Sequence, residues 1–213
     1  MPVIKPVITL DAQDLSCAMH KIWSEVPTSK AAPDGIVGIA TGGLVCANIL
    51  AKDLSLPMLE ITLRRPSTTR KSHPLSKKAL RLLPYAVSNW MRRFEDWKLE
   101  RQTRRLSPGT NGGSTETNAV LAATIASVAD RVRELELSHL VVIDDAVDSG
   151  ITLGRVMSDL RTALPSQVRL TSAVVCQTRP NPSYVPDVAL YHMCLCRFPW
   201  SFDFRGGTSR GKQ

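Results

Sequence analysis

The sequence contains no run of about eighteen apolar residues, and its first 30 residues lack a basic segment followed by an apolar one. We therefore expect neither a membrane-spanning helix nor a secretory leader, and no membrane partner. Cysteine occurs only five times, an odd number, and mostly inside apolar stretches. We interpret these cysteines as reduced packing residues of a cytoplasmic protein.

Histidine is equally scarce, and the four histidines are not spaced as metal ligands. His192, Cys194 and Cys196 alternate along an apolar stretch that we predict to be a strand, so their side chains would share one face. A fourth ligand at a suitable spacing is absent. We therefore interpret these three as packing residues rather than as a zinc site.

Acidic residues are too few to balance the basic ones, and the formal net charge is +8. The excess lies in one segment: residues 64–105 hold 13 Lys and Arg but 3 Asp and Glu, whereas the rest of the chain holds 14 and 16. Trp90, Phe94 and Trp97 recur within it at helical spacing. The segment could bind nucleic acid or a protein partner. A solvated basic helix packed by its aromatics, or a dimer contact, explains it equally well.

A chain of 213 residues suits one domain, and helices alternate with apolar strands along it. This alternation predicts an α/β fold, a parallel sheet flanked by helices, as a single domain over 1–213 with a basic helical insertion at about 64–114. In such sheets ligands bind beyond the carboxyl ends of the strands. The predicted strands are 35–40, 58–63, 139–143, 168–176 and an apolar run at 188–195; the predicted helices are 11–25, 44–54, 115–137 and 152–164.

Residues 139–153 (HLVVIDDAVDSGITL) are the most informative stretch. An apolar strand leads to Asp144 and Asp145, and a turn of small residues follows before a helix begins near Thr152. The two carboxylates would therefore lie beside a helix amino terminus, whose unpaired N–H groups attract phosphate. Paired acids beside a phosphate cradle suit a sugar phosphate with a divalent metal.

This stretch resembles the 5-phosphoribosyl-1-pyrophosphate (PRPP) signature of the type I phosphoribosyltransferases, and all thirteen positions from 141 to 153 fit. The resemblance implies that Asp144 and Asp145 are catalytic, holding the ribose hydroxyls directly or through Mg²⁺. Asp148 would face the base and could take a proton from it. The residues that would wrap the 5-phosphate are Ser149, Gly150, Ile151 and Thr152.

A glycine turn after the first predicted strand matches the pyrophosphate-binding loop of that family. It comprises Thr41, Gly42 and Gly43, with threonine where the family commonly has a cation. Arg64 and Arg65, at the end of the neighbouring predicted strand, could supply the missing charge. Residues 66–72 have the small polar composition of a mobile lid.

Two further segments resemble the xanthine/guanine-type members. Arg179, in Gln-Thr-Arg-Pro, matches a lysine that contacts the exocyclic oxygen of the base; an arginine in a surface turn is the alternative. Residues 195–200 (LCRFPW) resemble the hood over the base. Leu195 would stack on the base, the backbone at Cys196 would read its edge, and Trp200 would pack the hood, although plain core packing is equally possible here.

The resemblance implies a type I phosphoribosyltransferase fold with a lid and a C-terminal hood. The expected reaction moves the 5-phosphoribosyl group from PRPP to a nitrogen of a nucleobase-like acceptor, with Mg²⁺ as cofactor, release of pyrophosphate and a homodimer as the working unit. The alternative is a PRPP-sensing regulator whose basic segment contacts nucleic acid or a partner. A third possibility is an enzyme with an unusual acceptor.

Overall fold

The structure is a computed structural model that describes residues 5–28, 31–63, 85, 89 and 115–206. Arg64 and Arg65, the predicted lid at 66–72 and all of the basic segment except Tyr85 and Asn89 lie outside the described residues. Within the described part of the chain, no helix is both long and apolar enough to cross a lipid bilayer.

Five parallel strands form the main sheet in the order β3-β2-β4-β5-β6, which confirms the predicted α/β fold. From β2 the chain continues to β3 at one edge of the sheet, and from β4 it continues through β5 to β6 at the other edge. The direction in which strands are added therefore reverses between β2 and β4. Ligands of such sheets bind in the crevice beside that reversal. The strands are β2 (Gly35–Ile39), β3 (Met58–Ile61), β4 (His139–Val147), β5 (Arg169–Gln177) and β6 (Val188–His192).

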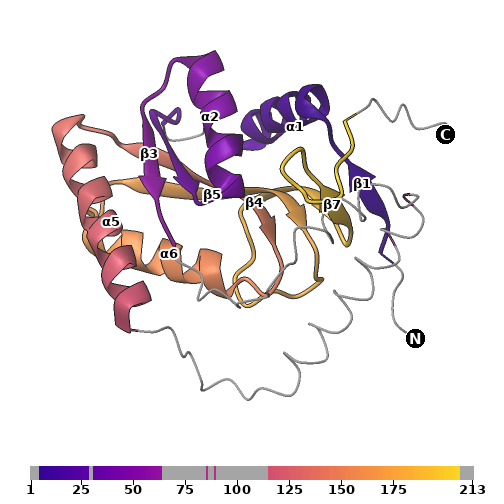
Figure 1. Ribbon diagram of the computed structural model, residues 1–213. Helices are drawn as coiled ribbons and strands as arrows, with labels where there is room; N and C mark the ends of the chain where they lie inside the picture. Colours follow the sequence, from indigo (N-terminus) through magenta and orange to yellow (C-terminus); the bar gives the residue numbers. More distant parts are fainter. Residues whose placement is uncertain (1–4, 29–30, 64–84, 86–88, 90–114, 207–213) are drawn as a thin grey trace.

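Among the described residues, helices α1 and α2 cover one face of the main sheet, and α5 and α6 cover the other (Figure 1). On β4, Val141 and Ile143 pack among residues of α1 and α2, while Leu140 and Val142 pack among residues of α5 and α6. Burial on both faces explains why the central strand is a continuous apolar run rather than an alternating one. The helices are α1 (Ala12–Glu25), α2 (Gly42–Leu54), α5 (Thr115–Glu134) and α6 (Ile151–Ala163).

The start of α1 follows from its sequence. Asp11 caps the helix, because its carboxylate accepts a hydrogen bond from the backbone N–H of Asp14 at 2.8 Å. In turn, the carboxylate of Asp14 accepts a hydrogen bond from the backbone N–H of Asp11 at 3.3 Å, which completes a capping box. Leu15, Met19 and Ile22 form the buried face, as the helical spacing predicts.

Strand β4 is longer than the predicted strand at 139–143. Its pairing with β5 continues as far as Val147, opposite Gln177, so Asp144 and Asp145 belong to the strand itself. The turn that follows is correspondingly short, and α6 begins at Ile151, one residue before its predicted start.

The predicted strand over 188–195 is confirmed only as far as His192, because the run divides between two sheets. Strand β6 ends at His192, and Met193 adopts a positive φ of 55° that turns the chain. Strand β7 (Leu195–Arg197) then pairs in parallel with a strand that the sequence did not predict, β1 (Val7–Thr9). His192 is exposed, while Cys194 and Cys196 are buried, so these three residues do not share one strand face.

Buried Arg197 holds this two-stranded hood together. Its side chain is 1% exposed, and its Nε lies 2.9 Å from an oxygen of fully buried Asp203. The other guanidinium nitrogens donate to Thr9 at 2.8 Å and to Asn89 of the insertion at 2.6 Å. The hood is therefore built from both ends of the chain and is tied to the insertion.

Candidate functional site

The glycine turn after β2 lies directly against the acid pair of β4. A Cβ at Gly42 would fall 1.9 Å from Oδ2 of Asp145, and one at Gly43 would fall 2.5 Å from the carbonyl oxygen of Ile143 and 3.2 Å from Oδ1 of Asp144. Only glycine fits at these two positions without moving the acids. The structure thus brings together two motifs about a hundred residues apart, at the reversal of the sheet.

The two acids differ in their exposure. Asp144 is buried and its Oδ1 accepts a hydrogen bond from the backbone N–H of Asp145 at 2.9 Å, whereas Asp145 is half-buried. Cys46 of α2 lies nearby: burial first, and then the charges of Asp145 and Asp144, raise the pKa of its thiol. Asp145 is thus the acid more open to a ligand.

A cleft of about 390 Å³ opens in front of Asp145. Trp200 lies on its wall, and its ring stacks on Phe198 with the ring centroids 4.8 Å apart. Trp200 therefore does more than pack the hood, which is the role that the sequence suggests, because it also forms part of the site. The peptide bond between Ala40 and Thr41 is cis. The lining residues of the cleft are Ala40, Thr41, Gly42, Leu63, Asp145 and Trp200.

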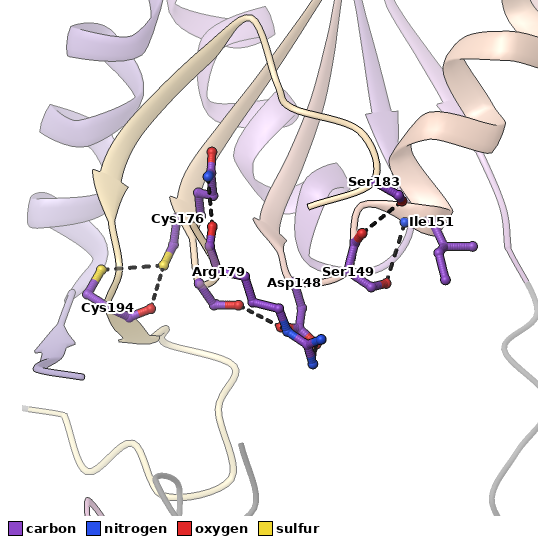
Figure 2. A network of polar contacts seen from close by, with 9 residues as sticks. Asp148, Ser149, Ile151, Cys176, Arg179, Ser183 and Cys194 are labelled. Carbon is purple, nitrogen blue, oxygen red and sulfur yellow. Dashed lines mark hydrogen bonds and ion pairs between the residues drawn. The ribbon is translucent and has the colours of Figure 1, made fainter. Parts of the chain in front are cut away.

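The start of α6 has the form of an anion cradle. Gly150 has a φ of 80°, and a Cβ there would meet the backbone of Tyr184 at 2.5 Å, so the tight turn requires glycine. The carbonyl oxygen of Ser149 accepts hydrogen bonds from Ser183 N at 2.7 Å and Ser183 Oγ at 2.8 Å, which fix the turn (Figure 2). Ile151 and Thr152 are exposed at the start of the helix, and the backbone N–H of Ile151 donates to Ser149 Oγ at 3.4 Å (Figure 2). Helix amino termini of this kind attract anions.

Asp148 and Arg179 form a bidentate ion pair (Figure 2). Arg179 Nε lies 2.5 Å from Oδ1 and Nη2 lies 2.9 Å from Oδ2, and Thr178 donates to Oδ1 at 2.8 Å. Gln177 supports the turn, since its side-chain amide donates to the carbonyl oxygen of Arg179 at 2.7 Å. Arg179 is thus not an isolated cation in a surface turn: its side chain is only 14% exposed and lies beside the acid predicted to face the base.

The predicted base-binding residues of the hood are less clearly placed. Leu195 is half-buried at the start of β7. The Cys196 side chain is buried next to Cys176 and Cys194, so only its backbone is suited to face a base. Arg197, Asp203 and the strand β1 give the hood its form, and their role left no signal in the local sequence pattern.

The acid pair suits a hard divalent cation. Among the described residues, no third His, Cys, Asp or Glu joins Asp144 and Asp145 in a compact ligand group. An ion held there would need further oxygen ligands from elsewhere. That donor set fits Mg²⁺, which proteins commonly bind through one or two carboxylates together with substrate phosphates and water.

Comparison with known proteins is consistent with this geometry. Residues 16–205 match a family model described as a phosphoribosyl transferase domain. No curated protein sequence matches the chain.

Several solved structures share its fold, among them the following three. The purine phosphoribosyltransferase from Pyrococcus horikoshii Ot3 is 18% identical with a TM-score of 0.51, and the match covers 92% of this chain and 94% of that one. The xanthine-guanine-hypoxanthine phosphoribosyltransferase of Helicobacter pylori is 14% identical with a TM-score of 0.53, over 92% and 93%. A hypothetical protein from Neisseria gonorrhoeae with bound ppGpp is 14% identical with a TM-score of 0.52, over 93% and 91%.

Proposed function

Because the chain belongs to the phosphoribosyl transferase domain family, we propose that it transfers the 5-phosphoribosyl group from PRPP to a ring nitrogen of a nucleobase that carries an exocyclic oxygen. Membership of this family supports an enzyme of the PRPP-dependent glycosyltransferase class. The proposal adds the residues that act and the class of acceptor.

One observation carries the proposal: the turn at Thr41–Gly43 touches the acid pair where the sheet reverses, and the α6 cradle begins at Ser149, five residues after Asp144. A single PRPP molecule needs three neighbouring sites, for its pyrophosphate, its ribose hydroxyls and its 5-phosphate. The glycine turn, the acid pair and the cradle supply them in that order. Backbone N–H groups suit the two anionic ends, and carboxylates suit the hydroxyls.

Electrostatic stabilisation is the expected source of the rate enhancement. As the bond from C1 of the ribose to pyrophosphate breaks, the sugar gains positive charge, which the carboxylates of Asp144 and Asp145 would stabilise. These two residues would also hold Mg²⁺, which when bound supplies positive charge to the leaving pyrophosphate. Arg64 and Arg65 remain predicted pyrophosphate ligands, outside the described residues.

The ion pair of Asp148 and Arg179 supports a base that has an N–H group and a carbonyl oxygen on the same edge. Asp148 would accept a hydrogen bond from the N–H group, and Arg179 would donate one to the carbonyl oxygen. Arginine has five N–H donors, and the bonds to Asp148 use those of Nε and Nη2, so Nη1 could still donate to a carbonyl oxygen of a base. Asp148 would accept the proton that the attacking heterocycle loses. Leu195 and the backbone of Cys196 complete the proposed base site.

The assay is release of pyrophosphate from PRPP and Mg²⁺ with guanine, xanthine, hypoxanthine, adenine, uracil and orotate offered separately. We expect turnover with one or more of the oxopurines. Turnover with adenine alone would refute the assigned role of Arg179, because adenine has no exocyclic oxygen.

Binding of PRPP tests the acid pair separately. The double variant D144N/D145N should lose PRPP binding by calorimetry in the presence of Mg²⁺ while remaining folded by circular dichroism. The matched control is D130N/E134Q, which also removes two negative charges, but from exposed ion pairs on α5. Unchanged binding by D144N/D145N would contradict the proposed site.

One observation favours a second function, that of a PRPP sensor. The described residues that line the cleft include no Lys or Arg, and Thr41 stands where the family commonly has a cation. A sensor would bind PRPP in calorimetry without releasing pyrophosphate in the presence of any base, so the two measurements distinguish it from an enzyme. The homodimer, the cytoplasmic location and a partner for residues 64–105 remain predictions from the sequence.

A further inference from the structure

The side chains of three buried cysteines meet where the hood joins the main sheet, and the proposed function uses none of their sulfur atoms. They come from separate segments: Cys176 from the end of β5, Cys194 from the β6–β7 connection and Cys196 from β7. Their sulfur atoms all lie within 4.8 Å of one another. The Cys176 and Cys194 sulfurs face each other at 3.4 Å, and the Cys176 thiol donates to the carbonyl oxygen of Cys194 at 3.1 Å (Figure 2).

The turn at Met193 creates this arrangement. Its backbone N–H donates to the carbonyl oxygen of Gln177 at 2.8 Å, and its positive φ of 55° redirects the chain, so that Cys194 lies beside Cys176. Strand β7 then positions the Cys196 side chain beside those of Cys176 and Cys194. Fixed backbone hydrogen bonds, rather than the flexibility of the side chains, thus bring the three sulfur atoms together.

The spacing matches that of thiolates around one metal ion. A metal–sulfur bond of about 2.3 Å places the sulfurs about 3.8–4.0 Å apart in trigonal or tetrahedral geometry. The sulfurs here would need to move by less than about 1 Å, which small rotations of the side chains allow. Among the described residues, no His, Asp or Glu joins the group, so its ligand atoms are sulfur alone.

We propose that Cys176, Cys194 and Cys196 form a binding site for one soft metal ion of the Zn(II) or Cu(I) class. All-thiolate sites select such ions over Mg²⁺ or Ca²⁺. Each thiol that becomes a ligand releases its proton to solvent. The surrounding residues are apolar, so the positive ion would stabilise sulfur anions that burial otherwise disfavours.

Binding would join the hood to the main sheet. Cys176 lies on β5, immediately before Gln177 and three residues before Arg179, while Cys196 lies on the strand of the predicted base site. An ion shared by both strands would fix the distance between them. Binding to the folded state alone also raises stability, by an amount that grows with the concentration of the ion.

The test uses the full chain, reduced and freed of metal, with Zn(II) or, under anaerobic conditions, Cu(I) as the probe. After desalting, elemental analysis should find one ion per chain. The variants C176S and C194S should retain less than a tenth of that amount. The matched control C17S, which changes an exposed cysteine on α1, should retain all of it.

A second measurement does not depend on any variant. Bound ion should slow alkylation of the three cluster thiols by at least tenfold in mass spectrometry, and should leave Cys17 and Cys46 unchanged. Failure of the folded wild-type chain to retain either ion would overturn the proposal, as would equal retention by C176S, C194S and C17S. A disulfide between Cys176 and Cys194 that forms under peroxide, with no retention of metal by the reduced chain, would likewise overturn it in favour of a redox pair.

Discussion

Replacing Gly42 with alanine should separate ligand binding from folding. The added methyl group would lie 1.9 Å from Oδ2 and 2.3 Å from Cγ of Asp145, distances that no pair of non-bonded atoms tolerates. The carboxylate is the free end of a side chain, so it can rotate away while the backbone stays in place. Gly42 itself lies outside the left-handed region, so alanine is compatible with its backbone.

The effect of G42A on stability should be smaller than its effect on PRPP binding. An unfavourable rotamer of Asp145 costs about 0.5–1.5 kcal/mol, and alanine in a helix gains up to about 1 kcal/mol over glycine. The free energy of unfolding should therefore change by no more than about 1 kcal/mol. Losing a charged hydrogen-bond partner of the ligand costs about 1.5–3 kcal/mol, which is a roughly ten- to hundredfold increase in the Kd for PRPP.

A double-mutant cycle identifies the cause. Calorimetry with PRPP and Mg²⁺ would compare wild type, G42A, D145A and G42A/D145A, and urea unfolding would follow stability. In D145A the two clashing atoms are gone, and the remaining contact, 2.9 Å to Cβ of Asp145, needs a shift of only tenths of an ångström. The double variant should therefore bind as weakly as D145A and no more weakly. Additive losses of affinity would refute the idea that Gly42 acts through Asp145.

Two further predictions concern stability. G150A should destabilise the fold by about 2–5 kcal/mol in urea unfolding, because a left-handed residue costs about 1–2 kcal/mol and overpacking against the backbone of Tyr184 about 1–3 kcal/mol; a loss below 1 kcal/mol would contradict this. Burial alone raises the pKa of Asp34, but hydrogen bonds from Ser138 and His139 outweigh it and lower that pKa below 3.8. The stability that Asp34 contributes is therefore present above pH 3.8 and lost as the pH falls through its lowered pKa. The advantage of wild type over D34N should accordingly hold from pH 7 to about pH 5 and shrink below about pH 4, and an advantage that grows on acidification would contradict the assignment.

The sequence predicts the centre of the site well because its chemistry is contiguous. One strand, one turn and one helix start supply the acid pair and the cradle, and each part has a local physical signal: an apolar run, adjacent carboxylates and small turn residues. The rule for parallel sheets then places the glycine turn at Gly42 beside them. The contact between Gly42 and Asp145 confirms that placement.

The spacing of apolar residues predicts the buried face of a helix less reliably when tertiary packing determines which face is buried. On the helix at 115–137, the apolar spacing favours a buried face of Val120, Ala123, Thr124, Ser127, Val128, Val132 and Leu135. In α5, Leu121, Ile125 and Ala129 are buried instead, together with Val128 and Val132, while Ala123 and Ser127 are exposed. Because this helix is rich in small and polar residues, its sequence is compatible with two overlapping buried faces. Contact of α5 with β3 and α6 determines which of the two faces is buried.

The sequence indicates a hood at 195–200, but the pairing of β1 with β7 that builds it could not be predicted, for a different reason. Its two strands of three residues each are too short for a periodic signal, and their pairing joins opposite ends of the chain. The residue that fixes them, Arg197, is a type normally found at the surface. Its burial depends on Asp203, Thr9 and Asn89 together, which no local motif could reveal.

That same arginine bears on the role of the insertion. The Asn89 side chain accepts a hydrogen bond from buried Arg197, and the Tyr85 ring lies 4.4 Å from its guanidinium carbon. Removing either contact would expose or leave unsatisfied a charged group that costs free energy to bury. The insertion follows β3 and precedes α5, and it is attached at these two residues to the hood beside the proposed base site. A change in the position of Asn89 would therefore be transmitted through Arg197 to β7, the strand that carries Leu195 of the proposed base site.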